Sequence, residues 1–306
     1  MQFFHCAKGY AEDKERRPGG WVNIDRPDKD DLIYLVENLK MPAAFLEALS
    51  DIDERPRFDH EGDWSMTILR IPTPGSPDGV PYRTVPLGIL TKDDYIVTLC
   101  YFKSEIISDF IAYSQRRELN IIRVADFVLH MLFSSTYWYL TYLKQMSRAV
   151  TSAERDMENS VKNRDLINLM GLQQSLTYFN TSLRGNQVLL ERLQRVYGDN
   201  FDHDLYDDLE VEMKQADNTI SVYSDILEST MDAVGSIISN NVNQVMKRMT
   251  SITIVLMVPT LIASFYGMNV EGLTFAALPF SFYIVILVAL LSTIATYLWL
   301  RHIKWF

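Results

Sequence analysis

The sequence predicts an α+β domain followed by a long helical stalk and two C-terminal transmembrane helices. Three observations predict this class. Strand-like and helix-like pieces alternate over roughly the first 120 residues, helical spacing with almost no breakers follows, and the apolar residues concentrate near the C-terminus. The chain has 306 residues and 48% apolar content, and that average conceals an ordinary acidic first part joined to a strongly apolar end.

Charge and cysteine content exclude several classes of function. The net charge of −10 argues against nucleic acid as a partner, because phosphate binding needs basic patches. Cys6 and Cys100 are too few for a disulfide framework, so we expect two small buried side chains in a reducing compartment. The start, MQFFHC, lacks the basic flank and apolar run of a signal peptide, so we expect the N-terminus to lie in the cytoplasm.

Residues 1–124 are expected to form the cytoplasmic α/β domain. GWVNIDRP is typical of a strand closed by a turn, while DKDDLIYLVENLK and MPAAFLEALSD are typical of two short helices. DWSMTILRIP and YRTVPLGIL flank the Pro- and Gly-rich TPGSPDGVP, which predicts a long hairpin, and YIVTLCYF predicts the next strand.

Residues 125–248 are expected to form the helical stalk, including the cytoplasmic part of a long pore helix. The aromatic stretch STYWYLTYL has helical spacing, which favours packing over a ligand site. From Phe201 no proline occurs before Pro259, so one helix of about sixty residues is possible. Its apolar positions step by four and three, which predicts a coiled-coil-like seam against this chain's own helices or other subunits; they are Leu205, Leu209, Met213, Ala216, Ile220, Tyr223, Leu227, Met231 and Val234.

Two membrane segments end the chain. We expect the first transmembrane helix over 249–269, an external loop over 270–277, the second transmembrane helix over 278–300 and a basic tail over 301–306. Basic residues flank the two segments and are absent from the loop, so the positive-inside rule predicts that both termini are cytoplasmic; they are Lys247, Arg248, Arg301, His302 and Lys304.

A polar stripe follows the first membrane segment. Its polar or sulfur-bearing side chains are spaced by four and three residues; they are Ser239, Asn243, Met246, Thr250, Thr253, Met257, Thr260 and Ser264. Ser and Thr often mediate contacts between membrane helices. This stripe, however, runs from Asp232 at the inner end to Asn269 at the outer end, which favours a water-lined pore. One stripe cannot enclose a pore, so the sequence predicts a ring-shaped homo-oligomer.

The stretch NQVMKRMTSITIVLMVPTLIASFYGMN, a short loop, a second span and the end RHIKWF together resemble the CorA-type divalent-cation channels. DERPRFDHEGDWSMTILRIP and VPLGILTKDDYIVTL resemble the cytoplasmic domain of the same family, so the resemblance covers essentially the whole chain. It implies a homopentamer with a funnel-shaped cytoplasmic α/β part. It also implies conduction of Mg²⁺, often with Co²⁺ and Ni²⁺, across the cytoplasmic (inner) membrane.

The GMN motif predicts a selectivity filter of Gly267, Met268 and Asn269. Mg²⁺ releases its waters reluctantly, so a ring of amide and carbonyl oxygens suits recognition of the hydrated ion. We expect Thr260 to supply a second oxygen ring, and Met246 and Met249 to form a narrow apolar collar. The membrane potential would drive inward movement, with about 2.3 kcal/mol per charge per 100 mV.

An acidic run suggests regulation by the transported ion. DNFDHDLYDDLEVE carries seven acidic residues before Lys214, and a solvated face is the simple explanation. In a ring of identical subunits this run would repel its own copies unless cations bound there. The resemblance implies a regulatory carboxylate at Asp208, and we expect Mg²⁺ to bind near Asp204, Asp207 and Asp208 and to close the channel.

Two other functions remain open. A zinc transporter of ZntB type shares the GMN motif, although the stripe carries neither His nor Cys, the ligands that favour zinc. A membrane-anchored sensor or scaffold without conduction is the alternative from a different class. We expect no enzyme activity, because the sequence has no Gly-rich phosphate loop, zinc-protease motif or nucleophile elbow.

Overall fold

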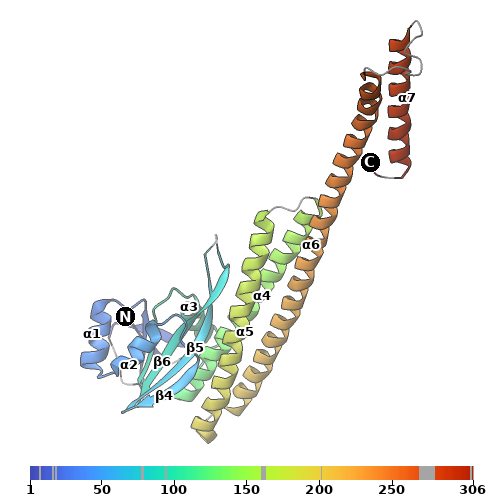
Figure 1. Ribbon diagram of the computed structural model, residues 1–306. Coiled ribbons are helices and arrows are strands. Elements are labelled where there is room, and N and C mark those ends of the chain that lie inside the picture. Colours follow the sequence, from blue (N-terminus) through green and yellow to red (C-terminus); the bar gives the residue numbers. More distant parts are fainter. Residues whose placement is uncertain are drawn as a thin grey trace. The chain divides into compact units, whose positions relative to one another are not determined.

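The computed structural model describes the whole chain except residues 7, 16, 18, 77, 78, 94, 160–162, 201, 269–279, 304 and 306. It consists of two compact units, Met1–Met231 and Asp232–Phe306. The first unit contains a sheet and most of the helices (Figure 1). The second contains the last part of a long helix and one further helix.

The described strands form one seven-stranded sheet with the order β2-β1-β3-β7-β6-β5-β4. The strands are β1 (Gln2–Cys6), β2 (Tyr10–Asp13), β3 (Trp21–Asp25), β4 (Arg57–Glu61), β5 (Trp64–Pro74), β6 (Tyr82–Lys92) and β7 (Tyr95–Cys100). β3 and β7 pair in parallel, and the other neighbours pair antiparallel. The hairpin predicted on either side of TPGSPDGVP is confirmed, since β5 and β6 pair along ten residues of each strand.

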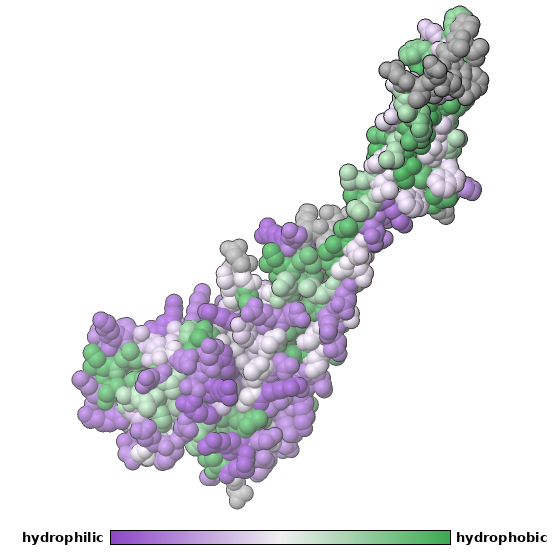
Figure 2. Space-filling model, in the orientation of Figure 1, coloured by the Kyte–Doolittle hydropathy of each residue, from purple (hydrophilic) through white to green (hydrophobic). Residues whose placement is uncertain are grey.

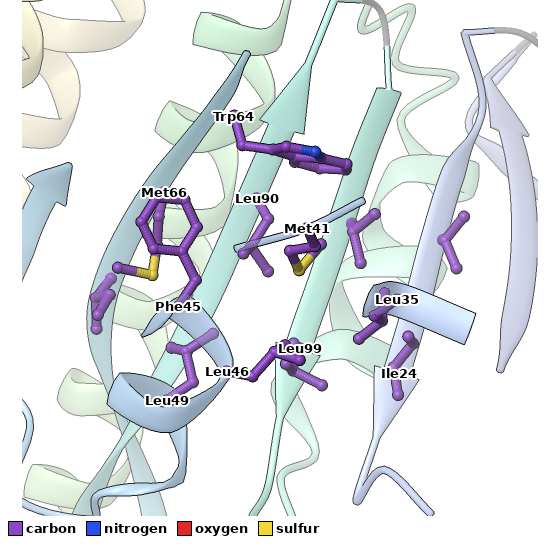
Figure 3. Close-up of a cluster of buried hydrophobic side chains, with 13 residues drawn as sticks. Ile24, Leu35, Met41, Phe45, Leu46, Leu49, Trp64, Met66, Leu90 and Leu99 are labelled. Atoms are coloured by element: carbon purple, nitrogen blue, oxygen red, sulfur yellow. The ribbon is translucent and has the colours of Figure 1, made fainter. Parts of the chain in front are cut away.

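Short helical segments cover one face of this sheet. They are α1 (Lys29–Ile33), the π-helix η1 (Tyr34–Asn38) and α2 (Ala43–Ser50). Apolar side chains from η1 and α2 on one side, and from β3, β5, β6 and β7 on the other, form the buried cluster between these helices and the sheet (Figure 3). Gly88 permits the close approach of α2, because a Cβ atom there would lie 2.3 Å from Leu49 Cδ1. The single helix predicted over DKDDLIYLVENLK is therefore partly wrong: after Ile33 it continues as a π-helix.

Two long helices pack on the sheet through β4, β5 and β6. They are α4 (Val124–Asn159) and α5 (Asn163–Tyr197), and the shorter α3 (Ile106–Arg116) lies beside β2 and α4. The aromatic stretch is packing, as predicted: Tyr139 is fully buried and meets the Phe179 ring edge to face, with centroids 4.9 Å apart. Burial raises the pKa of Tyr139 well above its usual value, so this hydroxyl stays neutral.

A buried arginine joins the sheet to these helices. Arg70 is 8% exposed, and its guanidinium donates to the carbonyl oxygens of Ile52 (2.6 Å), Glu54 (3.0 Å) and Thr84 (2.7 Å). Asn186 of α5 bonds both backbone groups of Arg70, accepting from its N–H at 2.9 Å and donating to its carbonyl at 2.8 Å. Burial lowers the pKa of Arg70, and backbone oxygens accept its hydrogen bonds in place of a paired carboxylate.

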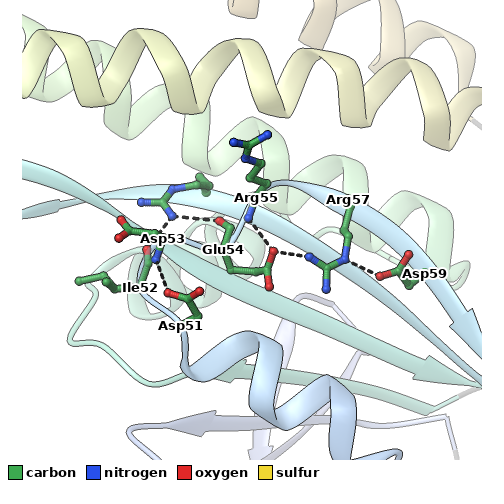
Figure 4. A network of polar contacts seen from close by, with 8 residues as sticks. Asp51, Ile52, Asp53, Glu54, Arg55, Arg57 and Asp59 are labelled. Carbon is green, nitrogen blue, oxygen red and sulfur yellow. Dashed lines mark hydrogen bonds and ion pairs between the residues drawn. The ribbon is translucent and has the colours of Figure 1, made fainter.

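The segment that contains Ile52 and Glu54, which Arg70 bonds, carries a network of charged side chains (Figure 4). Glu54 accepts hydrogen bonds from the Arg55 backbone N–H at 2.9 Å and from the Arg57 guanidinium, which also bonds Asp59. These pairs lie at the surface, where ion pairs contribute little stability, so the buried Arg70 is the stronger anchor of the segment.

The longest helix, α6 (His203–Tyr266), has 64 residues, and α7 (Ser281–His302) follows it. The predicted helix of about sixty residues is confirmed. Its apolar seam is buried within this chain, because Leu209, Met213 and Ile220 are at most 1% exposed. Gln187 of α5 donates to the Met213 carbonyl at 3.4 Å, and Arg184 of α5 pairs with Asp217 at 3.4 Å.

Candidate functional site

The candidate transport path lies in the second unit, on α6 and α7. Both helices are long and apolar enough to cross a membrane. The hydropathy view shows apolar residues gathered over the last part of α6 and over α7 (Figure 2). Few of these side chains are covered, because only 6% of the most apolar window in each helix is buried. Such a surface is stable in lipid or against further protein, but not in water.

One face of the last part of α6 is less exposed than the others. Ser251 is fully buried, and the less exposed positions after it recur at helical spacing; they are Ile254, Val255, Val258, Pro259, Ile262 and Tyr266. The less exposed residues of α7 are mostly small or hydroxyl-bearing, a composition typical of membrane helices in close contact; they include Ala289, Ser292, Thr293 and Thr296. The composition and spacing of these less exposed faces favour packing of α6 against α7.

The polar stripe lies on the opposite face of α6. All eight of its residues from Ser239 to Ser264 are exposed in this chain. At roughly 100° per residue, the centre of the stripe lies about half a turn from the face that packs on α7. Helix packing between α6 and α7 therefore does not account for these polar side chains. From Thr253 to Ser264 the stripe is therefore distinct from the less exposed face, whereas every residue from Gly235 to Thr250 is exposed, so exposure does not single out the inner half of the stripe.

Two hydroxyls of the stripe are oriented by the helix itself. Thr253 Oγ1 donates to the Met249 carbonyl at 2.9 Å, and Thr260 Oγ1 donates to the Leu256 carbonyl at 2.8 Å. Because each hydroxyl proton is already used, what these oxygens present beyond the helix is acceptor capacity. An uncharged acceptor suits a cation or its hydration shell.

Three methionines interrupt the polar character of this face. Met246 is 60% exposed, Met249 is 65% exposed and Met257 is 64% exposed. In a single soluble chain such exposure would be unfavourable, so these side chains also need neighbours. Met246 and Met249 lie close together along the helix, as the predicted apolar collar requires, but in one chain they enclose nothing.

The predicted filter begins just after α6. The helix ends at Tyr266, three residues earlier than the segment predicted over 249–269. Gly267 N–H still donates to the Ala263 carbonyl at 2.9 Å, and Met268 N–H donates to the Phe265 carbonyl at 3.3 Å. Asn269 and the predicted loop over 270–277 lie outside the described residues.

The predicted regulatory acids lie in the first unit. Asp204, Asp207 and Asp208 are exposed in the first turns of α6. Among the described residues, no three His, Cys, Asp or Glu side chains are grouped so that they could hold a metal ion. A site here would therefore need ligands that this part of one chain does not supply.

Sequence reasoning missed Ser251. Its hydroxyl oxygen is buried and has no hydrogen-bond partner among the described residues. Ser251 follows Thr250 of the stripe, so it lies about 100° round the helix from the stripe. This angle was the signal in the sequence that its hydroxyl faces a different direction. An unpaired hydroxyl between two membrane helices costs free energy unless water or another group reaches it.

Comparison with known proteins supports one family. Residues 19–302 match the family described as CorA-like Mg²⁺ transporter protein. The chain is 26% identical over 288 residues to the cobalt/magnesium transport protein CorA of Methanocaldococcus jannaschii, covering 92% of this chain and 90% of that protein. It is 24% identical over 270 residues to the protein of the same name from Thermotoga maritima, covering 82% of this chain and 73% of that one.

Solved structures share the fold. The complete CorA magnesium transporter of M. jannaschii matches with a TM-score of 0.83 at 22% identity, covering 100% of this chain and 98% of that one. The ZntB cytoplasmic domain from Vibrio parahaemolyticus matches with a TM-score of 0.62 at 14% identity, covering 78% of this chain and 98% of that one. Since the family match spans nearly the whole sequence, the chain belongs to the CorA-like Mg²⁺ transporters.

Proposed function

We propose that this protein conducts Mg²⁺, and also Co²⁺ or Ni²⁺, into the cell through a pore lined by the α6 stripes of identical subunits. The observation that carries the proposal is the uncovered polar face of α6, which lies opposite the face that packs on α7. Several copies are required to enclose a path, and the resemblance to the CorA-type channels implies a pentamer. Both termini would lie on the cytoplasmic side of the inner membrane.

The ion path would begin at Gly267, Met268 and Asn269, where oxygen rings recognise a hydrated ion. Thr260 and Thr253 would offer further acceptors, because their protons are held by the helix. The collar of Met246 and Met249 would exclude water when closed. Asn243 and Asp232 would then rehydrate and attract the ion at the inner end.

Binding of cytoplasmic Mg²⁺ would close this channel. Asp204, Asp207 and Asp208 are exposed, and in a ring of identical acidic subunits they would repel their copies unless a divalent cation bound between them. The affinity would be weak, because Mg²⁺ keeps most of its waters when only a few carboxylates bind it.

Zinc transport is the second candidate, supported by the fold shared with a ZntB cytoplasmic domain. The composition of the stripe favours the first candidate. It offers hydroxyl, amide and thioether groups and no imidazole or thiolate, which are the ligands that select zinc.

Metal flux into liposomes that contain the purified protein separates these functions. The proposal predicts saturable Mg²⁺ entry that grows with an inside-negative potential and needs no proton gradient. Flux of Zn²⁺ alone would favour the ZntB-type function. Absence of any metal flux would favour a sensor or scaffold.

Replacing the predicted filter amide tests the entry site. Asn269→Ala removes an oxygen ring and changes little packing, so we expect Mg²⁺ flux to fall by on the order of 100-fold, from roughly half a kcal/mol per subunit over five subunits. Oligomer size by light scattering is the control for assembly. Flux at the wild-type rate in an intact oligomer would rule out this filter.

A further inference from the structure

A cavity in the α/β part of the first unit belongs neither to the proposed ion path nor to the proposed regulatory site. It has a volume of about 240 Å³ and lies where the end of η1 and the residues after it meet β3, β5, β6 and β7. Its lining residues include the apolar Val22 and Val97, the aromatic Trp64 and Tyr95, and the basic Lys40 and Lys92.

One lining residue, Trp64, carries a buried hydrogen-bond donor that has no acceptor among the described residues. Trp64 is 3% exposed, and its indole nitrogen has no hydrogen-bond partner among the described residues. Figure 3 shows this indole at one end of the apolar cluster, beyond Met41 and Leu90. A buried N–H without a partner costs about 1–3 kcal/mol, so an acceptor at this position would be stabilising.

The backbone at the cavity is irregular in two places. The π-helix η1 ends at Asn38, which lines the cavity, and Lys40 adopts the left-handed conformation with φ of 56°. A left-handed conformation is uncommon for a lysine, and π-helical segments are rare and frequently occur at functional sites. The segment from Asn38 to Lys40 is therefore held in an unusual backbone conformation beside the cavity.

Charge and size restrict the ligand. Lys40 is exposed at the cavity, and Lys92 pairs at 2.9 Å with Asp63, whose side chain is 76% exposed and therefore easily displaced. The volume exceeds the roughly 30 Å³ that one water occupies, but it is below the roughly 300 Å³ at which drug-sized sites begin. A single ring with one anionic group fits both limits.

We propose that this cavity binds a small organic anion with a flat apolar body, which places an acceptor at Trp64 and its charge beside Lys40 and Lys92. The apolar body lies on Val22, Val97 and the Trp64 ring. The Trp64 nitrogen is closed to solvent in this conformation, so binding requires neighbouring cavity residues to move before the ligand can accept its hydrogen bond. The site is independent of the pore.

The full-length protein in lipid nanodiscs, labelled with 5-fluorotryptophan, provides the test. Fluorine NMR follows the Trp64 signal, assigned as the signal that Trp64→Phe removes, while benzoate or phenyl phosphate is added. We expect a saturable shift with at least one of them, and the tighter probe identifies the charged group as carboxylate or phosphate. Inorganic phosphate lacks the ring and benzyl alcohol lacks the charge, so we expect each to bind at least about tenfold more weakly than the tighter aromatic anion.

Two matched variants make the test specific. Lys40→Asn removes the charge and tolerates the left-handed conformation, so we expect about tenfold weaker binding without loss of folding. Lys29→Asn makes the same change at an exposed residue of α1 that does not line the cavity and should bind like the wild type. The proposal is overturned if neither probe shifts the Trp64 signal saturably, or if Lys40→Asn or benzyl alcohol gives the wild-type response.

Discussion

The two units of this chain place their polar groups in opposite ways. Met1–Met231 contains buried polar side chains that are paired inside the chain: Trp21 donates to Thr98 at 2.8 Å, and Asn186 bonds the backbone of Arg70, although the indole nitrogen of Trp64 has no partner among the described residues. In Asp232–Phe306 only Val234, Ser251 and Leu300 are buried among the described residues, and the polar stripe is uncovered. The first unit carries its own core, whereas the second exposes an apolar surface that requires lipid or further protein to cover it.

The contrast between the two units would be wrong if the stability of the first unit did not depend on its buried polar contacts. Arg70→Met leaves the carbonyl oxygens of Ile52, Glu54 and Thr84 without their donor, so we expect a loss of about 3 kcal/mol in the free energy of unfolding. Urea unfolding followed by far-UV circular dichroism measures the loss.

The exposed arginine on the neighbouring strand is the matched control. Arg83→Met changes the same chemical group on β6, and we expect a change within about 0.5 kcal/mol. Equal losses in the two variants would contradict the role of the buried network.

A smaller effect sharpens the dependence on other copies. Mg²⁺ at ten times its dissociation constant should stabilise the assembled wild type by about 1.4 kcal/mol. In Asp208→Lys a tethered cation replaces the bound one, so added Mg²⁺ should raise the Tm or protease resistance much less. Glu228→Lys makes the same charge change on an exposed part of α6 beyond the acidic run and should respond like the wild type. An undiminished response in Asp208→Lys would exclude this site.

The smallest effect is a pH dependence confined to the first unit. Burial lowers the pKa of His130, although Asp126 and Asp202 oppose the shift. The unfolded chain therefore takes up the proton at a higher pH than the folded chain, and stability present above about pH 6.5 is lost as the pH falls below it. Thermal unfolding between pH 7.5 and 5.5 should show a shallower loss for His130→Gln than for the wild type. If the Tm of the two proteins fell equally with pH, His130 would not cause the pH dependence.

Much of this architecture could be predicted from residue spacing. The seam through Leu209, Met213 and Ile220 is regular enough to identify α6 and its buried face, and the stripe from Ser239 to Ser264 is regular enough to identify the uncovered face. Both are periodic patterns along one helix, which is the kind of information that a single sequence carries.

Other features leave no local pattern. Amphipathic spacing does not distinguish an α-helix from the π-helix at Tyr34–Asn38, because both present one apolar face over a few residues. Arg70 resembles any charged residue on a strand, and its partner Asn186 is 116 residues away. Whether Asn269 forms a filter depends on other subunits and was not predictable from the spacing of one chain.

The central claim is that the polar stripe of α6 lines the pore. The accessibility of single cysteines during transport tests it most directly. In a chain with Cys6→Ser and Cys100→Ala, cysteine replaces Thr253 or Thr260 of the stripe, or Ile262 on the face packed against α7. We predict that a positively charged methanethiosulfonate reagent blocks Mg²⁺ flux through Thr253→Cys and Thr260→Cys, because the modified side chains obstruct the pore, and that flux through Ile262→Cys and the cysteine-free protein is unchanged. Block at Ile262→Cys with undiminished flux at both stripe positions would contradict a pore lined by this face of α6.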